Sequence, residues 1–120
     1  MKLLIIDDSA DTRESLAACF QKLGQEVVTA ASGTAAFVEM IRHRFDVILL
    51  DLVMPNMSGS AFFKQATEHY GPLPPVIMIT GFDADYPKKL DGVAAVLTKP
   101  LDLATVVQTV AEVVAGRKGV

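Results

Sequence analysis

The sequence predicts an α/β fold with a five-stranded parallel sheet and helices on both faces. Short apolar runs alternate along the chain with longer segments in which apolar residues recur at helical spacing. Apolar runs without polar interruption are typical of strands buried on both faces, and such strands occur mainly in parallel sheets. Parallel neighbours are joined by crossover helices, so this alternation indicates consecutive βα units.

Composition and charge limit the size and class of the protein. The chain has 120 residues, 51% of them hydrophobic, and a mean hydropathy of +0.37, which suits a single domain over residues 1–120. The net charge of −3 and the pI of about 5.2 argue against direct nucleic-acid binding. No apolar run is long enough to span a bilayer, and Asp7 and Asp8 interrupt the N-terminal run too early for a signal peptide. We therefore expect a cytoplasmic protein that does not insert into membranes.

The first two predicted strands enclose a helix with clear boundary signals. Leu3–Ile6 is entirely apolar and predicts the first strand. Either Asp8 or Ser9 can cap the helix that follows, because both side chains accept hydrogen bonds from free backbone amides. Gly24 suits the end of this helix, since glycine readily adopts positive φ. Val27–Ala30 predicts a second, shorter strand.

The middle of the chain carries the strongest strand signal. Ser32–Gly33 begins the second predicted helix, and Phe45–Leu50 follows as a strand that is apolar except at Asp46. The segment Pro55–Gly59 contains Pro, Asn, Ser and Gly, which are typical of a loop. Ala61–His69 is predicted to be the third helix.

The last third contains two strands, a weak segment and a closing helix. Val76–Thr80 and Val93–Leu97 predict the fourth and fifth strands, and Ala104–Ala115 predicts the closing helix. The segment Gly81–Gly92 contains Pro87 and a glycine at each end, so we expect a short or irregular fourth helix there.

Polar groups stand where the predicted strands end: Asp7, Asp8, Asp51, Thr80 and Lys99. Because parallel strands finish at one edge of the sheet, and ligands bind in open α/β sheets at that edge, these groups are predicted to meet. Three carboxylates, a hydroxyl and an ammonium suit a hard cation together with a phosphoryl group.

Simpler interpretations compete for some of these residues. Asp8 can serve as a helix cap beside a solvated Asp7. Asp51 is harder to explain in this way, because it ends a buried strand and precedes a loop, so its carboxylate needs a cation or hydrogen bonds. A lone Lys99 is usually solvated, but an acidic cluster favours an inward orientation. Cys19, His43 and His69 have no partners at ligand or catalytic spacing, and both histidines are expected at the surface.

The predicted site suits phosphoryl transfer to a carboxylate. Mg²⁺ takes one or two protein carboxylates and binds phosphate oxygens, and another carboxylate can attack phosphorus to give an aspartyl phosphate. The chain lacks the GxxxxGK[ST] motif of P-loop proteins and a GxGxxG motif after its first strand. An ordinary nucleotide-hydrolysing or dinucleotide enzyme is therefore not supported.

Over nearly its whole length the chain resembles the receiver domain of two-component response regulators. The motifs that carry the resemblance are, in chain order, Asp7–Asp8, Arg13, Leu16, Gly24, Phe45–Asp51, Met54–Gly59, Pro75–Thr80 and Lys99–Pro100. The resemblance implies the strand order 2-1-3-4-5, as in the flavodoxin-like folds to which this family belongs. It also implies a cis Lys99–Pro100 bond.

The resemblance further implies a role for each site residue. Asp51 is the phosphoacceptor and receives the phosphoryl group from a phosphohistidine on a sensor histidine kinase or histidine phosphotransfer protein. The carboxylates of Asp7, Asp8 and Asp51 and the backbone carbonyl of Val53 hold Mg²⁺, or Mn²⁺ in its place. The hydroxyl of Thr80 and the ammonium of Lys99 contact the phosphoryl oxygens, and these two residues complete the catalytic set with Asp51.

Two features depart from the usual receiver pattern. Receivers usually carry Tyr or Phe three residues before the lysine, a side chain that turns inward on phosphorylation, and this chain has Val96 there. Phe82 is a candidate substitute for that aromatic, while Pro100 is a structural neighbour of the switch. The second departure is the short segment Gly81–Gly92, in the region that often carries output contacts in this family.

Three functions are compatible with these features to different degrees. The leading one is a phosphorylation-dependent signalling switch rather than a metabolic enzyme, which promotes its own phosphorylation and dephosphorylation on Asp51. The alternative is a receiver-like interaction module that works without phosphorylation. A phosphatase is disfavoured, because such enzymes typically carry a second Asp two residues after the nucleophile, where this chain has Val53. The output partner stays open, as do the choice between monomer and phosphorylation-linked dimer and the choice between a stand-alone regulator and part of a longer protein.

Overall fold

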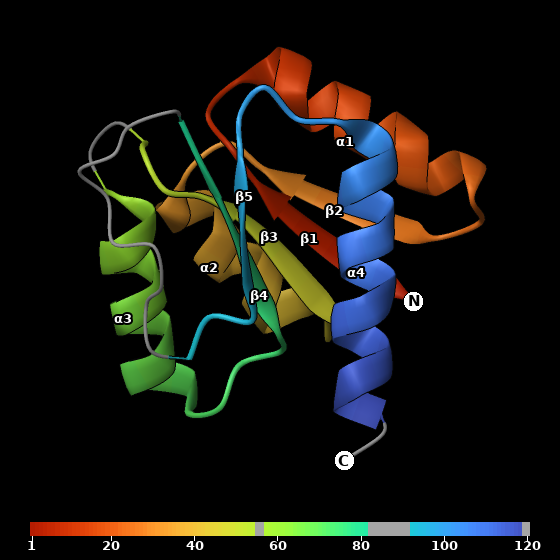
Figure 1. Ribbon diagram of the computed structural model, residues 1–120. Helices are drawn as coiled ribbons and strands as arrows, with labels where there is room; N and C mark the ends of the chain where they lie inside the picture. The colour runs from red at the N-terminus through yellow and green to blue at the C-terminus, as the bar shows by residue number, and fades with distance from the viewer. Residues whose placement is uncertain (55–56, 82–91, 119–120) are drawn as a thin grey trace.

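The structure, a computed structural model, describes residues 1–54, 57–81 and 92–118, and their side chains as far as residue 116. The elements in chain order are β1 (Lys2–Ile6), α1 (Ala10–Lys22), β2 (Glu26–Ala30), α2 (Gly33–Arg42), β3 (Val47–Asp51), α3 (Gly59–Tyr70), β4 (Val76–Thr80), β5 (Ala95–Thr98) and α4 (Leu103–Lys118). All neighbouring strands pair in parallel, in the order β2-β1-β3-β4-β5 (Figure 1). The predicted fold class and strand order are therefore confirmed.

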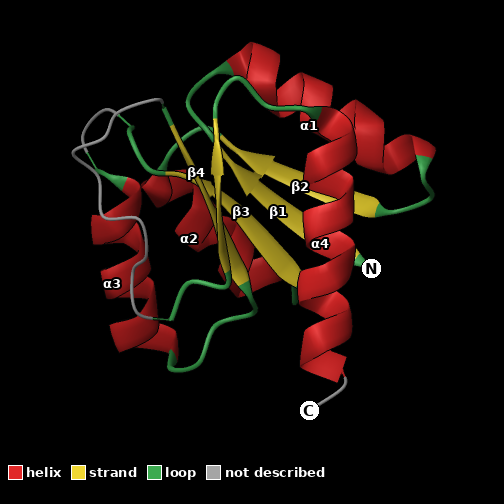
Figure 2. Ribbon diagram, viewed as in Figure 1, coloured by secondary structure: helices red, strands yellow, loops and turns green. Residues whose placement is uncertain are grey.

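Each face of the sheet has its own apolar core. Residues of β1 and β3 alternate between the faces, because successive side chains of a strand point in opposite directions. Leu3, Ile5, Val47 and Leu49 pack with α1 and α4, while Leu4, Ile6, Ile48 and Leu50 pack with α2 and α3. The two helix pairs cover opposite faces in Figure 2. Each of these eight strand side chains is 0% exposed, and full burial of a Leu or Ile stabilises a fold by about 1.5–3 kcal/mol.

Short polar side chains cap the helices. The Oγ of Ser9 accepts a hydrogen bond from the Thr12 amide at 3.3 Å, and the equivalent distance at Ser32 is 3.1 Å. Ser58 caps α3 in the same way at 3.1 Å, and Asp102 caps α4 through the Thr105 amide at 3.3 Å. Of the two candidate caps predicted for α1, Ser9 is therefore the one used, which leaves the Asp8 carboxylate available to the site.

Several predicted boundaries are displaced by a few residues. β3 begins at Val47 rather than at Phe45, and β5 begins at Ala95 rather than at Val93. α3 begins two residues before the predicted Ala61, because Ser58 provides the cap. The closing helix extends beyond the predicted Ala115, to Lys118. The predicted irregular helix over residues 81–92 falls almost entirely outside the described residues.

Two further expectations concern the surface. His69 is exposed as predicted, but His43 is only half exposed, because its Nδ1 lies 2.8 Å from the Nζ of Lys2 at the amino end of β1. Among the described residues, no helix is long and apolar enough to cross a membrane.

Candidate phosphoryl-transfer and metal site

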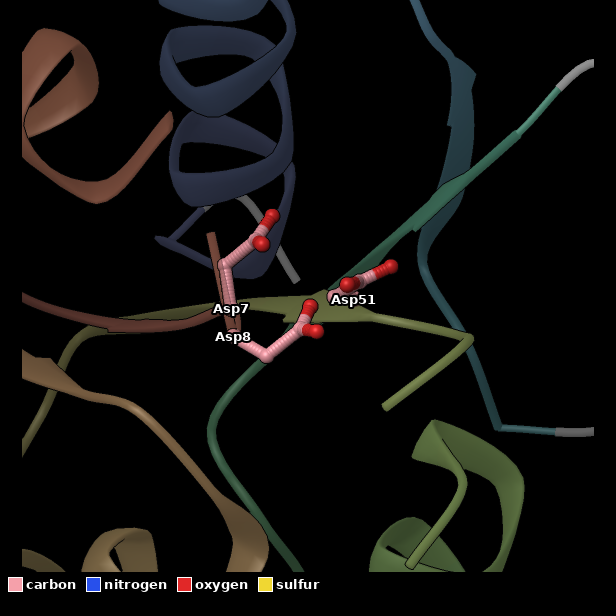
Figure 3. A group of neighbouring side chains, drawn as sticks. All are labelled: Asp7, Asp8 and Asp51. Carbon is pink, nitrogen blue, oxygen red and sulfur yellow. The ribbon is translucent and has the colours of Figure 1, made fainter. Parts of the chain in front are cut away.

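The predicted site residues gather at the carboxyl edge of the sheet. Asp7 and Asp8 follow β1, and Asp51 and Thr80 are the last residues of β3 and β4. Asp7, Asp8 and Asp51 each place one carboxylate oxygen within 4.8 Å of the others. In Figure 3 the side chains of Asp7 and Asp8 project in different directions from consecutive positions, and the Asp8 carboxylate points toward Asp51.

Asp7 is the most deeply buried acid of the site. Its side chain is 0% exposed, and its Oδ1 accepts a hydrogen bond from the Ser9 amide at 2.9 Å. Its Oδ2 is buried and accepts no hydrogen bond, although the Nζ of Lys99 lies 3.2 Å away as an ion-pair partner. A buried carboxylate oxygen in this state is costly unless a cation compensates it.

Asp51 is held at the end of the central strand by its neighbours. It is 3% exposed, and its Oδ1 accepts a hydrogen bond from the Val53 amide at 3.2 Å. The next residue, Leu52, donates its amide to the Ile79 carbonyl of β4 at 2.8 Å and accepts from the Gly59 amide at 2.8 Å. Asp51 therefore stands between two strands and the start of α3, with its carboxylate facing the other acids.

Glycine is required where α3 begins. A Cβ placed on Gly59 would collide with the carbonyl oxygen of Asp51 and would lie 2.8 Å from the Cα of Leu52. Both of these atoms belong to the backbone and cannot move aside as a flexible side chain would. The absence of a side chain at Gly59 therefore allows the first turn of α3 to pack directly on the peptide that carries Asp51.

The electrostatics of the site favour a proton or a cation on Asp51. Burial is the largest cause that raises the pKa of Asp51, which moves from 3.8 to about 7, and the nearby Asp7 carboxylate raises it further. The Val53 amide and the Lys99 ammonium act in the opposite direction, while Asp8 adds a smaller increase. Negative charge at this edge thus exceeds what the single ammonium offsets, and a bound divalent cation would reverse that balance.

Lys99 joins two of the acids. Its Nζ lies 3.2 Å from Asp7 Oδ2 and 3.8 Å from Asp51 Oδ2, and its side chain is 30% exposed. The Lys99 amide donates to the carbonyl of Thr80 at 2.7 Å, which fixes the start of this loop against β4. The peptide bond between Lys99 and Pro100 is cis, as the resemblance to receiver domains implied. The inward orientation expected for Lys99 is therefore present.

Thr80 carries a second buried atom without a partner. It is 8% exposed, and its Oγ1 has no hydrogen-bond partner among the described residues. Hydroxyls are usually satisfied when buried, so this atom is available to a ligand. Together with Asp7 Oδ2, which accepts no hydrogen bond, it gives the edge both a cation-binding oxygen and a hydroxyl donor.

The residues present fit a hard divalent cation. Carboxylate oxygens are the ligands that Mg²⁺ and Mn²⁺ prefer, and three converge here with one buried oxygen lacking a hydrogen bond. Val53 is 51% exposed and its amide is bonded to Asp51, while the ligand role of its carbonyl stays a prediction.

The residues predicted for the switch are described only in part. Val96 is half-buried in β5, opposite Met78 of β4, and packs against the core beneath α2 and α3. Phe82 lies outside the described residues. Pro100 is exposed and follows the cis bond.

One contact at the site was not predicted. The Nη1 of Arg13, in the first half of α1, donates a hydrogen bond to the backbone carbonyl of Asp7 at 2.7 Å. The sequence contains a weak signal for this contact. A cation near the N-terminus of a helix interacts unfavourably with the helix dipole, which suggests that a nearby acceptor compensates for it. Arg13 belongs to the receiver-domain motif, but the resemblance assigns it no role.

Comparison with known proteins identifies the family to which the chain is similar. The family model of the response regulator receiver domain matches residues 3–111. The chain is 34% identical to protein PilH of Pseudomonas aeruginosa, covering 96% of this chain and 98% of that protein. It is 31% identical to the response regulator receiver protein CpdR of Brucella abortus, covering 91% and 92%. It is also 35% identical to the sensory transduction protein RegX3 of Mycobacterium tuberculosis, but spans only 44% of that protein's length.

Solved structures agree in fold. The chemotaxis response regulator CheY4 of Vibrio cholerae superposes with a TM-score of 0.82 at 32% identity, covering 93% of this chain and 97% of that one. A receiver domain protein from Clostridium thermocellum gives a TM-score of 0.85 at 24% identity, covering 98% and 96%, and bears on the fold alone. The chain therefore belongs to the response regulator receiver domain family, and it is a phosphoacceptor switch domain of two-component signalling.

Proposed function

We propose that Asp51 is the phosphoacceptor and that it reacts with Mg²⁺ held by Asp7, Asp8, Asp51 and the carbonyl of Val53. The observation that carries this proposal is the convergence of the three carboxylates within 4.8 Å, beside a buried Asp7 oxygen that accepts no hydrogen bond. Mn²⁺ has the same ligand preference and would serve in place of Mg²⁺.

Several features favour Asp51 over its two neighbours as the nucleophile. Asp7 is 0% exposed, and one of its oxygens is engaged by the Ser9 amide, so it is suited to holding a cation. Asp8 is exposed and points its carboxylate toward Asp51 (Figure 3). Asp51 ends the central strand, and its Oδ2 lies 3.8 Å from the ammonium of Lys99, which also pairs with the fully buried Asp7 at 3.2 Å. That placement puts a positive group beside the atom that would gain the phosphoryl group.

The reaction needs one bond to form and one to break. An oxygen of Asp51 attacks phosphorus, the new O–P bond forms, and the P–N bond to the donor imidazole breaks with its electron pair leaving on nitrogen. Bound Mg²⁺ would supply neutralisation of the phosphoryl oxygens. Lys99 would contribute its ammonium to the same oxygens, and the free Oγ1 of Thr80 would donate a hydrogen bond. Attack of water on the aspartyl phosphate later returns the Asp51 carboxylate.

The proposed biological role follows from this chemistry. The donor would be a sensor histidine kinase or histidine phosphotransfer protein in the cytoplasm, and the phosphorylated form would change binding to an output partner. The chain would act as one receiver domain over residues 1–120 and as a switch with autocatalytic phosphorylation and dephosphorylation, not as a metabolic enzyme. Membership of the receiver family supports these points.

The proposal is tested by intact mass after incubation with acetyl phosphate. The wild-type chain should gain one phosphoryl group only when Mg²⁺ is present, and Asp51→Asn should gain none because an amide is a poor nucleophile. Asp11→Asn, the same change at an exposed position in α1, should gain the group as the wild type does.

Two outcomes would contradict the assignment. A phosphoryl group that still appears on Asp51→Asn would place the acceptor elsewhere. A folded wild-type chain that neither gains mass nor binds Mg²⁺ would instead favour the interaction module that works without phosphorylation.

A further inference from the structure

We propose that Arg13 is a positioning residue for the metal site, because it fixes the peptide group that joins Asp7 to Asp8. This inference rests on the proposed binding of Mg²⁺ by these two residues. It assigns a role to a side chain that would contact neither the cation nor the phosphoryl group.

The contact itself is short and directed. Arg13 is half-buried in α1, and its Nη1 donates to the Asp7 carbonyl at 2.7 Å. Hydrogen bonds from a charged donor such as a guanidinium are stronger than those between neutral groups. The bond links α1 to the buried residue that directly follows β1.

The other bonds of Asp7 restrain different parts of the turn. The Asp7 amide donates to the Ala30 carbonyl of β2 at 3.1 Å, which fixes the peptide before Asp7. The Asp7 Oδ1 accepts from the Ser9 amide at 2.9 Å, which fixes the peptide after Asp8. Within the described part of the chain, Arg13 is the only group that bonds to the carbonyl of the peptide between the two acids.

The orientation of that peptide determines how the two carboxylates relate. It is bounded by the ψ angle of Asp7 and the φ angle of Asp8, so rotating it changes the direction of one side chain relative to the other. Figure 3 shows the two carboxylates diverging from the chain, with only Asp8 aimed directly at Asp51. An arginine that holds the carbonyl therefore holds the spacing of two proposed ligands, and such indirect partners typically contribute 10- to 100-fold to metal affinity.

The charge of Arg13 and its proposed positioning of the peptide have opposite effects on Mg²⁺ binding, so an experiment can separate them. Arg13 is a cation close to a cation-binding site, and its charge alone disfavours Mg²⁺. If charge were its whole effect, replacing it with a neutral residue would tighten Mg²⁺ binding. If it positions the acids, the same replacement weakens binding.

The experiment is a calorimetric titration of the full chain with Mg²⁺, alongside thermal unfolding to confirm that each variant folds. Arg13→Gln should weaken Mg²⁺ binding about tenfold, the lower end of the range for such partners. Arg42→Gln is the matched control, because it removes the same charge from a side chain that is 68% exposed on α2 and pairs with Glu39. It should bind Mg²⁺ within about twofold of the wild type, since nothing at the site touches it.

A conservative variant adds a second readout. Arg13→Lys keeps the charge, and its ammonium reaches farther than the shorter amide of Gln to donate the single bond, so it should bind Mg²⁺ more tightly than Arg13→Gln. Arg13→Met keeps the apolar part of the side chain and is used if the Gln variant does not fold. The same loss of Mg²⁺ affinity is expected for it.

The outcomes separate this inference from the proposal on which it rests. Mg²⁺ affinity in the Gln or Met variant that equals or exceeds that of the wild type would overturn the positioning role. A Gln variant that binds as tightly as the Lys variant would overturn it as well. Absence of Mg²⁺ binding by the wild-type chain would instead overturn the proposed metal site, and this inference with it.

Discussion

Asp51, the proposed phosphoacceptor, lies in a place that is unfavourable for a charged carboxylate. Its pKa is raised from 3.8 to about 7, chiefly by burial and then by Asp7. The folded chain therefore holds a proton on this carboxyl more tightly than the unfolded chain does. Without a divalent cation, the stability that comes from protonated Asp51 is fully present below about pH 4 and is lost as the pH rises through about 7.

This linkage predicts the pH dependence of an Asp51→Asn variant. The amide has no charge to bury, so at pH 8 the variant should unfold at a higher urea concentration than the wild type. Its free energy of unfolding should exceed that of the wild type by at most about 4 kcal/mol. The difference should shrink toward pH 4, where the wild-type carboxyl is protonated. Urea unfolding across this range without divalent cations measures the effect, and a difference independent of pH would contradict it.

The convergence of Asp7, Asp8, Asp51 and Lys99 could be predicted from sequence because topology decides it. A polar residue that follows an apolar strand must lie at the carboxyl edge of a parallel sheet. The Arg13 contact could not be predicted in that way. It depends on how α1 is rotated above the sheet and on a backbone acceptor, and neither leaves a pattern in the residue types.

Among the elements, the start of α3 is the one most tightly coupled to the site. A methyl group on Gly59 would meet the backbone of Asp51 and Leu52, as the 2.8 Å approach to the Leu52 Cα shows. Gly59→Ala should therefore displace α3 from the loop and destabilise the fold by roughly 1–3 kcal/mol. It should also slow phosphorylation by acetyl phosphate, because Asp51 would shift with the loop.

A glycine elsewhere serves as the control for this change. Gly116 lies in α4, and among the described residues no atom beyond its chain neighbours and its own helix backbone would come within 4 Å of an added Cβ. Gly116→Ala should leave phosphorylation unchanged and should be neutral or stabilising by up to about 1 kcal/mol, since alanine favours helix. Equal losses of stability in the two variants, measured by urea unfolding, would show that contact with the site loop is not the cause.

Element types were easier to predict than element ends. Apolar runs for strands and helical spacing of apolar residues for helices were sufficient to locate every described strand and helix. The predicted and observed ends differ where a side chain near the end makes a hydrogen bond of its own. The side chain of Asp46 accepts a hydrogen bond from the Lys2 amide at 2.7 Å, and β3 starts only after it, at Val47. The start of α3 was missed because Gly59 resembles a loop residue until its packing is known.

For the whole molecule, cation binding and folding should be linked. A ligand that binds only the folded chain stabilises it by mass action, by about 2.7 kcal/mol at a hundred times its dissociation constant. Mg²⁺ should therefore raise the unfolding midpoint of the wild-type chain at pH 8, and Asp8→Asn should lose most of this gain. Sodium chloride at the same ionic strength is the control, and an equal rise with sodium would indicate screening of charge rather than binding.

The sheet lies between two separately packed cores, with alternate residues of β3 contributing to each. Close-packed interiors resist compression and deform little. The sheet is therefore the stiff part of the protein, and Asp51 lies at its carboxyl edge. Phosphorylation at Asp51 should therefore disturb the packing of the strands little, and the five strands should keep their register in the phosphorylated chain.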